Sequence, residues 1–257
     1  MAGIADSPYF LLVLLVSSFA MPLFFMAWIR NTARYGREPW LTVLKAFAWG
    51  AVFSVIIALV FSLVLIVTLG QIGPLNDFLA KRFTDPLTII GAVIVAPFVE
   101  EAAKGIGVRA GRPQIQALLD GLVYGAAAGL GFSATENLFY GIDALLNPNG
   151  GASASLIVIA VRSFSSSFLH ASATAVVGYG LAKSWLTGRA GAFFPYYLVA
   201  VVMHATFNLL ASLGQSYATQ YGELGETVGF AAAVTFGVIA ITIVRFKLAS
   251  RPPSVAR

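Results

Sequence analysis

The feature that most constrains this chain is its series of long apolar runs, separated by short polar stretches. Apolar residues make up 58% of the 257 positions and charged residues only 11%, against roughly 25% charged residues in an ordinary soluble domain. Crossing a ~30 Å hydrocarbon core takes about 20 helical residues. Runs of that length form helices or a closed barrel, because lipid offers backbone groups no hydrogen-bond partner. The runs lack the alternation of barrel strands, so we expect an all-α membrane protein.

Seven apolar segments of this kind can be marked. They cover residues 8–29, 41–69, 87–107, 118–140, 155–186, 193–213 and 228–244, and turns rich in Gly and Pro separate several of them. We therefore expect about seven transmembrane helices in a single domain over residues 1–248, followed by a short disordered tail at 249–257. The sequence contains no cysteine, which excludes disulfides and thiolate metal ligands.

The cations are concentrated in alternate loops. Most of the sixteen Lys and Arg residues follow the odd-numbered segments, namely Arg30, Arg34, Arg37, Lys45, Lys104, Arg109, Arg112, Lys183, Arg189, Arg245, Lys247, Arg251 and Arg257. The positive-inside rule then places the N-terminus outside and the C-terminus in the cytoplasm. This pattern explains the net charge of +5 better than nucleic-acid binding does. We expect a multi-pass integral protein of the cell membrane that binds no nucleic acid.

Several ionisable side chains nevertheless lie inside the apolar segments. Such groups are costly in lipid, and those that are kept usually face the bundle interior and serve function. Each has a structural interpretation as well, because a lone membrane His or Asn is commonly an interhelical hydrogen-bonding residue. The group consists of Glu100, Glu101, Lys104, Glu136, Arg162, His170 and His204, with Asn137 and Asn208 as polar neighbours.

The spacing of four of these residues predicts that they share one depth. Glu100, Glu136, His170 and His204 follow one another at intervals of 36, 34 and 34 residues. Residues on adjacent antiparallel helices lie at equal depth when the midpoint between them falls at the turn. The second and third midpoints fall in or beside Gly- and Pro-rich loops, and the first falls beyond its turn. We therefore expect a polar site near the middle of the membrane.

The charges in this group do not balance. The three carboxylates outnumber Lys104 and Arg162 by one, and a bound cation or a protonated Glu would offset the difference. Glu100 and Glu101 project about 100° apart on a helix, and Lys104 can pair with either of them. Arg162 is equally well explained as a counter-charge and as a topology anchor.

Several hydrolytic mechanisms are excluded because their motifs are missing. The sequence has no His-Glu-x-x-His zinc motif, no Gly-x-Gly-Asp aspartyl motif, no Gly-x-Ser-Gly serine motif and no phosphate-binding loop. The remaining chemistry is hydrolysis by Glu-activated water, with imidazole and carboxamide groups that bind a metal or stabilise an oxyanion.

The order of these residues resembles the PrsW family of intramembrane proteases, which are related to the CAAX prenyl endopeptidases. The resemblance spans roughly residues 34–210. It rests on Glu100-Glu101-x-x-Lys104, Gly131-Phe132-x-x-x-Glu136-Asn137, His170 ahead of Gly178, His204-x-x-x-Asn208, and the stretches at 34–40 and 120–125. The CAAX enzymes have His where this chain has Glu136, so the resemblance does not support a prenylated substrate. It implies cleavage of a membrane-anchored protein such as an anti-sigma factor.

Two versions of the chemistry follow from this resemblance and the residues. In the first, Glu100 or Glu101 is the general base, and Glu136, His170 and His204 hold zinc or another divalent metal. In the second, which is metal-free, Glu136 assists the base while His204 and Asn208 form an oxyanion hole. Lys104, Asn137 and Arg162 have supporting roles.

Two other classes of function stay open at this stage. A transporter would use the acidic cluster to bind protons or cations, and it predicts discontinuous helices around the site. A non-catalytic membrane scaffold would use the same surface to bind a partner.

Overall fold

The computed structural model describes residues 7–33, 36–81, 86–216 and 218–250, and every regular element within these ranges is helical. The all-helical expectation is therefore confirmed for this part of the chain, while residues 251–257 of the predicted tail lie outside it. The elements are α1 (Pro8–Thr32), α2 (Trp40–Trp49), η2 (Gly50–Ser54), α3 (Val55–Gly70), α4 (Gly73–Ala80), α5 (Pro86–Ile89), η3 (Ile90–Val95), α6 (Ala96–Gly107), η4 (Val108–Gln114), α7 (Leu118–Leu146), α8 (Ala152–Phe164), α9 (Ser166–Thr187), η5 (Ala190–Phe193), α10 (Phe194–Ser216) and α11 (Ala218–Ala249).

Five of the seven predicted segments correspond to helices that are long and apolar enough to cross a membrane. These candidate spans are Pro8–Thr32, Trp40–Gly70, Ala152–Thr187, Ala190–Leu213 and Thr227–Ala249. The other two segments, 87–107 and 118–140, are also helical and correspond to α5–η3–α6 and α7. The described chain is thus a multi-spanning helical protein with five candidate spans.

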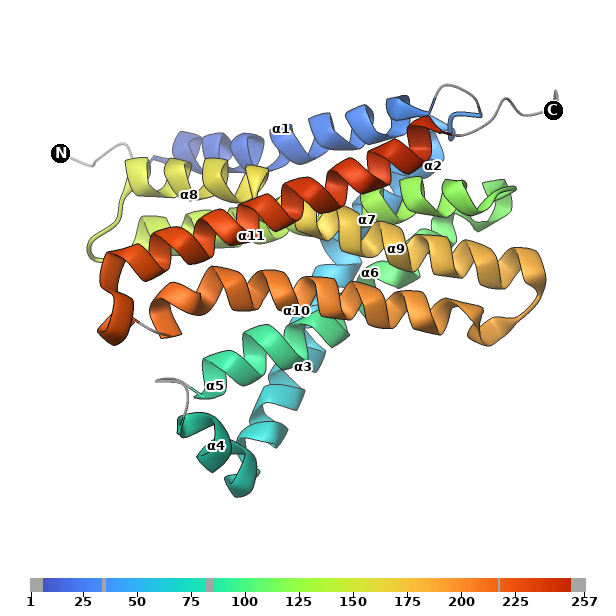
Figure 1. The fold of residues 1–257 in the computed structure, drawn as a ribbon. Coiled ribbons are helices and arrows are strands. Elements are labelled where there is room, and N and C mark those ends of the chain that lie inside the picture. Colours follow the sequence, from blue (N-terminus) through green and yellow to red (C-terminus); the bar gives the residue numbers. More distant parts are fainter. Residues whose placement is uncertain (1–6, 34–35, 82–85, 217, 251–257) are drawn as a thin grey trace.

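The helices form a bundle with a hairpin projecting from it (Figure 1). Helices α1, α7, α9, α10 and α11 run alongside one another, and α9 contacts α7, α10 and α11. Helix α3 and the α5–η3–α6 segment lean away from the bundle, and α4 joins them at the tip. The outer surface of α3 is apolar and exposed, as for Val64 with 57% of its surface accessible. Such a surface is stable only in contact with lipid or another protein.

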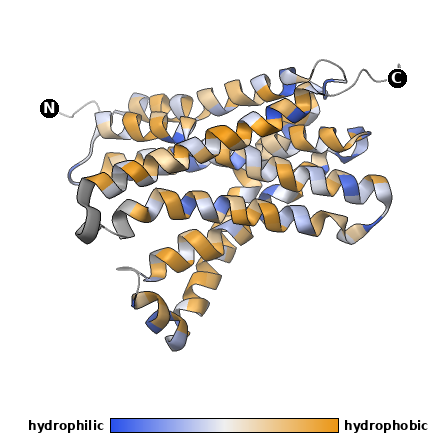
Figure 2. Cartoon of the chain, viewed as in Figure 1, coloured by the Kyte–Doolittle hydropathy of each residue, from blue (hydrophilic) through white to orange (hydrophobic). Residues whose placement is uncertain are grey.

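The cation-rich ends of the helices lie on one side of the bundle. The end of α1, η4, the α9–α10 connection and the end of α11 all lie at the right in Figure 1, and Figure 2 shows hydrophilic residues at these ends. Lys45, Arg109, Arg112 and Arg189 are exposed there. This is the clustering that the alternate-loop pattern of the sequence predicts.

Helix α7 is the buried centre of the bundle, and glycine allows its close approach to α9. A Cβ atom at Gly125 would lie 2.2 Å from the carbonyl oxygen of Thr174, and one at Gly129 would lie 2.1 Å from that of His170. Gly121 makes the same kind of approach one turn earlier. Small residues at four-residue spacing let membrane helices pack backbone to backbone. This packing fixes the position of His170 relative to α7.

Two π-helical segments, η2 and η3, interrupt the long helices of the described chain. A π-helical turn inserts a residue and disturbs the regular hydrogen-bond ladder, so its carbonyl groups need other donors. Thr135 Oγ1 donates to the carbonyl oxygen of Ala51 in η2 at 2.7 Å. Asn208 Nδ2 donates to that of Ala92 in η3, also at 2.7 Å. Each π-helical segment therefore accepts a hydrogen bond from a polar side chain of a neighbouring helix.

Candidate active site

A buried ion pair on α6 forms the centre of the site. Glu101 and Lys104 are three residues apart on one helical face, and Lys104 Nζ lies 2.6 Å from Glu101 Oε1. Both side chains are completely buried. The other carboxylate oxygen, Oε2, accepts a hydrogen bond of 2.9 Å from Thr174 Oγ1 on α9. Both oxygens of Glu101 are thus held in place, as a charge buried away from water requires.

Helix α10 brings His204 to the same ion pair. Its Nδ1 lies 2.9 Å from Glu101 Oε1. Because the carboxylate can only accept, Nδ1 carries the proton, and the lone pair of the neutral ring is on Nε2. That atom lies 3.8 Å from Glu100 Oε2, a distance too long for a hydrogen bond. A histidine that donates one ring N–H to a carboxylate while its other nitrogen stays available is the usual arrangement at metal centres.

Helix α9 places His170 between two charged groups. Lys104 Nζ lies 2.9 Å from His170 Nδ1, and an ammonium group can only donate. The proton of the neutral ring is therefore on Nε2, which donates to Glu136 Oε2 at 2.9 Å. His170 and His204 are also in ring contact, with centroids 5.0 Å apart. His170 thus links the ion pair of α6 to the carboxylate of α7.

Arg162, at the end of α8, completes the cluster. Its Nη2 donates to Glu136 Oε2 at 2.9 Å, and its guanidinium group stacks on the Tyr140 ring at 3.6 Å. The structure thus gives Arg162 the counter-charge contact, the first of its two sequence interpretations. Within the described chain, Oε1 of Glu136 has no hydrogen-bond partner, and the side chain keeps 21% of its surface accessible.

Glu100 differs from its neighbour Glu101 because it faces a cavity. The cavity has a volume of about 600 Å³ and lies between α3, η3, α6 and α7. Glu100 and Glu136 are its charged lining residues, and the rest of the wall is mainly apolar, including Leu59, Leu63 and Phe132. Lys104 Nζ is 3.4 Å from Glu100 Oε2. The two adjacent carboxylates therefore lie in different surroundings, one enclosed and one open to the cavity.

The structure brings together the four residues that were expected to share one depth. Within the described chain, one group of side chains has the spacing of metal ligands. It consists of Glu100, His170 and His204, and one ligand atom from each lies within 4.8 Å of the others. This grouping contains Glu100 where the sequence prediction had Glu136. One carboxylate and two imidazoles are a donor set that suits a divalent metal. The distance between Glu100 Oε2 and His204 Nε2 is 3.8 Å. A metal–ligand bond is ~2.0 Å long, so an ion between these two atoms would be within bonding distance of both.

The two asparagines bind elsewhere. Asn208 donates to a backbone carbonyl of η3, as described above. Asn137 is buried and lies 3.4 Å from the hydroxyls of Ser163 and Ser167. In this geometry both side chains join helices around the cluster. Sequence reasoning did not identify Thr174 as a partner of Glu101, although its position four residues after His170 puts it on the same face of α9.

Comparisons with known proteins agree with this arrangement. Residues 38–244 match the family described as PrsW family intramembrane metalloprotease. The chain belongs to this family. It is also 26% identical over 200 residues to Protease PrsW of Clostridioides difficile (strain 630), a match that covers 75% of this chain and 76% of the relative. No solved structure matches the chain.

Membership of the PrsW family identifies the chain as an intramembrane protease, and the matched residues include the whole cluster described above. The family match confirms the predicted resemblance and favours a protease over a transporter or a scaffold. With five candidate spans, the protein is a multi-pass integral membrane protein.

Proposed function

We propose that this protease cuts a membrane-anchored protein, such as an anti-sigma factor, inside the 600 Å³ cavity that Glu100 and Glu136 line. The observation that carries this proposal is the position of two carboxylates at the wall of an otherwise largely apolar cavity. Ligand sites generally combine apolar walls with a few convergent polar groups, in volumes of about 300–1,000 Å³. Helix α3, whose outer surface is apolar and exposed, forms one wall of the cavity. A membrane-anchored segment can therefore reach the cavity along α3.

A divalent metal ion, for which zinc is our first choice, fits the group of Glu100, His170 and His204. Such an ion supplies Lewis-acid polarisation of the scissile carbonyl. The Nε2 lone pair of His204 already faces Glu100. His170 would bind such an ion as a neutral imidazole, with its proton on the ring nitrogen that does not face the ion. The formal charge of the cluster without metal is one negative, so a bound cation is electrostatically favoured.

Glu136 is then the general base. Arg162 holds one of its oxygens at 2.9 Å, and the other has no partner within the described chain while the side chain faces the cavity. This partnerless oxygen would accept a proton from water, while Arg162 and His170 hold the other oxygen in place. Glu101 and Lys104 do not line this cavity. They contact His204 and His170, so we assign them as positioning residues for these two histidines.

The cation pattern orients the chain in the membrane. We place the cation-rich side in the cytoplasm, with an external N-terminus and seven spans that include α5–η3–α6 and α7. Residues 1–248 then form the protease domain, and 249–257 form the cytoplasmic tail. We place the cluster near the middle of the bilayer, in line with the intervals of 36, 34 and 34 residues between Glu100, Glu136, His170 and His204.

The test combines cleavage with metal analysis. Purified protein is incubated with a single-span substrate, and its metal content is measured by mass spectrometry in parallel. We expect Glu136→Gln to abolish cleavage while retaining metal, and Glu100→Gln to lose both. Glu101→Gln should keep metal with reduced activity. Active protein that stays free of metal would refute the metal assignment and make Glu100 the general base. Retention of full cleavage in both Glu100→Gln and Glu136→Gln would refute the site itself.

A further inference from the structure

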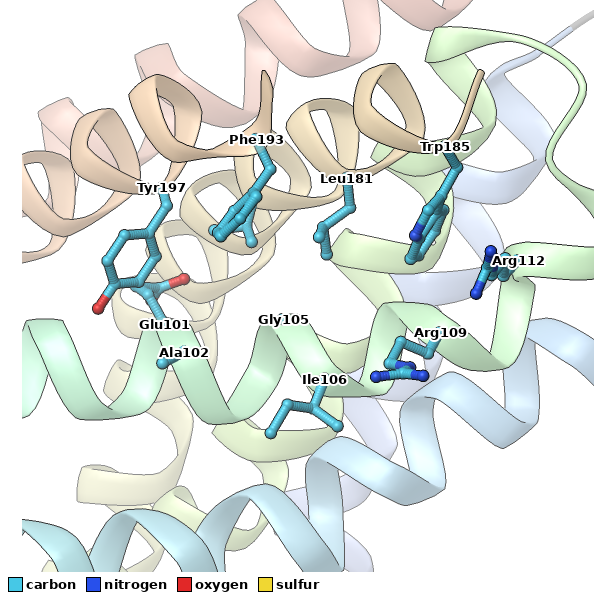
Figure 3. A pocket seen from close by; sticks show the side chains of 11 residues that line it. Glu101, Ala102, Gly105, Ile106, Arg109, Arg112, Leu181, Trp185, Phe193 and Tyr197 are labelled. Carbon is cyan, nitrogen blue, oxygen red and sulfur yellow. The ribbon is translucent and has the colours of Figure 1, made fainter. Parts of the chain in front are cut away.

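A second cavity lies on the other side of α6 from the proposed substrate cavity. It has a volume of about 400 Å³ and is bounded by α6, η4, α9, η5 and α10. Figure 3 shows its lining side chains in a row. Arg109 and Arg112 lie at one end, and Glu101 and Tyr197 lie at the other. Eight residues of helix separate Glu101 from Arg109, which corresponds to about 12 Å. The cavity is therefore long and has distinct ends.

The two ends differ in chemistry. At the outer end, both arginines are exposed, and neither has an ion-pair partner in the part of the chain that the structure describes. The guanidinium of Arg112 lies 5.6 Å from the centre of the Trp185 ring. The middle is apolar, with Ile106, Leu181 and Phe193 along the wall. At the inner end the Glu101 carboxylate is fully enclosed and already paired with Lys104, so it presents little charge to a ligand.

We propose that this cavity binds an anionic phospholipid. The phosphate would contact Arg109 and Arg112, and one acyl chain would lie along Ile106, Leu181 and Phe193 towards Tyr197. Paired guanidinium groups suit phosphate because they donate several hydrogen bonds in a planar arrangement. Basic pockets between membrane helices on the cytoplasmic side are typical binding sites for anionic head groups, and these arginines lie on the cation-rich side of the bundle.

Two features favour a lipid over other occupants. The apolar middle offers water few hydrogen-bond partners, and ordered water is stable only where two or more polar groups hold it. The substrate of the protease would occupy the other cavity, because Glu100 and Glu136 line that one and not this one. An amphiphile with one anionic end and a long apolar part matches both the charge and the walls. The placement of the substrate in the other cavity rests on the proposed function, whereas the arguments from charge and from the apolar walls do not.

Native mass spectrometry of the full chain in detergent tests this assignment. The probes are phosphatidylglycerol, phosphatidylcholine with the same acyl chains, and inorganic phosphate. We expect saturable binding of phosphatidylglycerol, at least tenfold weaker binding of phosphatidylcholine, and no competition by inorganic phosphate. In the double variant R109Q/R112Q, phosphatidylglycerol should bind roughly thirtyfold more weakly, because each surface cation contributes about 1 kcal/mol to such binding.

A matched control removes the same charge from the same side of the molecule. Lys45 and Arg189 are exposed and do not line the cavity, so K45Q/R189Q should bind phosphatidylglycerol as the wild type does. Ile106→Trp narrows the apolar part without changing the charge, and it should weaken lipid binding several-fold. Ile106 is 42% exposed, so this variant is expected to fold.

Three results would overturn the proposal. Equal weakening in R109Q/R112Q and K45Q/R189Q would show a non-specific charge effect. Competition by inorganic phosphate at similar affinity would make this a phosphate site without an acyl-chain requirement. Unchanged lipid binding in both R109Q/R112Q and Ile106→Trp would place the lipid elsewhere.

Discussion

Replacing Lys104 by methionine should destabilise the protein strongly, and a second substitution at Glu101 should then cost much less than it does in the wild type. Lys104 is fully buried, and its Nζ lies 2.6 Å from Glu101 Oε1. Methionine retains much of the length of the side chain but leaves the Glu101 carboxylate without its counter-charge. Removing one partner of a buried ion pair typically costs about 3–5 kcal/mol. We expect a loss of this size for K104M.

The formal charges of the cluster explain why the two substitutions should not be additive. With both histidines neutral, Glu100, Glu101 and Glu136 against Lys104 and Arg162 give one net negative charge. K104M raises this to two negative charges, and E101Q lowers it to zero. K104M/E101Q returns to one negative charge, with a neutral amide that His204 and Thr174 can still contact. The coupling free energy between the two substitutions should therefore be about 2–3 kcal/mol, within the range found for residues of one buried network.

The measurement is the unfolding free energy of the four proteins, followed in detergent by intrinsic tryptophan fluorescence against denaturant. Lys45→Met is the matched control, because Lys45 is exposed, and its removal should change stability by less than about 0.5 kcal/mol. A coupling energy below about 0.5 kcal/mol would mean that the two effects are additive. That result would refute the assignment of Glu101 and Lys104 as one ion pair that organises the site.

Three further predictions concern packing and positioning around the site. Gly125→Leu should abolish folding, because even its Cβ would lie 2.2 Å from a carbonyl oxygen of α9. The control is Gly191→Leu, whose added Cβ has nothing within 4 Å; its expression and its elution volume in size-exclusion chromatography should be unchanged. Asn208→Ala should lower the unfolding free energy by about 1–3 kcal/mol, because its hydrogen bond to η3 is lost. The metal content should stay unchanged, and a loss of metal would instead make Asn208 part of the metal site. Arg162→Gln should reduce the rate of cleavage at saturating substrate by at least tenfold with little effect on KM, and Arg162→Lys should restore part of it; a change confined to KM would contradict a role through Glu136.

The sequence predicted the helical class and most of the cluster, because both depend on simple physical rules. Apolar runs of sufficient length must form helices in lipid. Ionisable residues within them must turn inward, and equal spacing brings them to one depth. This reasoning placed Glu136, His170 and His204 together, and the structure connects His170 to Glu136 at 2.9 Å. The close packing of α7 on α9 could also have been predicted, since Gly121, Gly125 and Gly129 follow one another at four-residue spacing.

The π-helical segments could not be predicted from the apolar pattern. A π-helical turn inserts one residue and rotates everything that follows it relative to a regular helix. The sequence signal for it is small, because the inserted residue is apolar like its neighbours. The hydrogen bond from Asn208 to the carbonyl group of Ala92 in η3 was therefore not expected from the sequence. Only the positions of both helices reveal that contact.

Glu100 and Glu101 have different surroundings, and this difference depends on the packing of neighbouring helices rather than on the local sequence. Adjacent helical residues project about 100° apart, so the sequence already separates the two carboxylates but does not say which one faces a partner. That choice depends on α9 and α10, which place Thr174 and His204 against Glu101 and leave Glu100 at the cavity wall. Lys104, His204 and Thr174 already hold the Glu101 carboxylate. This difference in surroundings is why we propose Glu100 and Glu136, at the cavity wall, as the reacting carboxylates and Glu101 as the residue that holds His204 beside them.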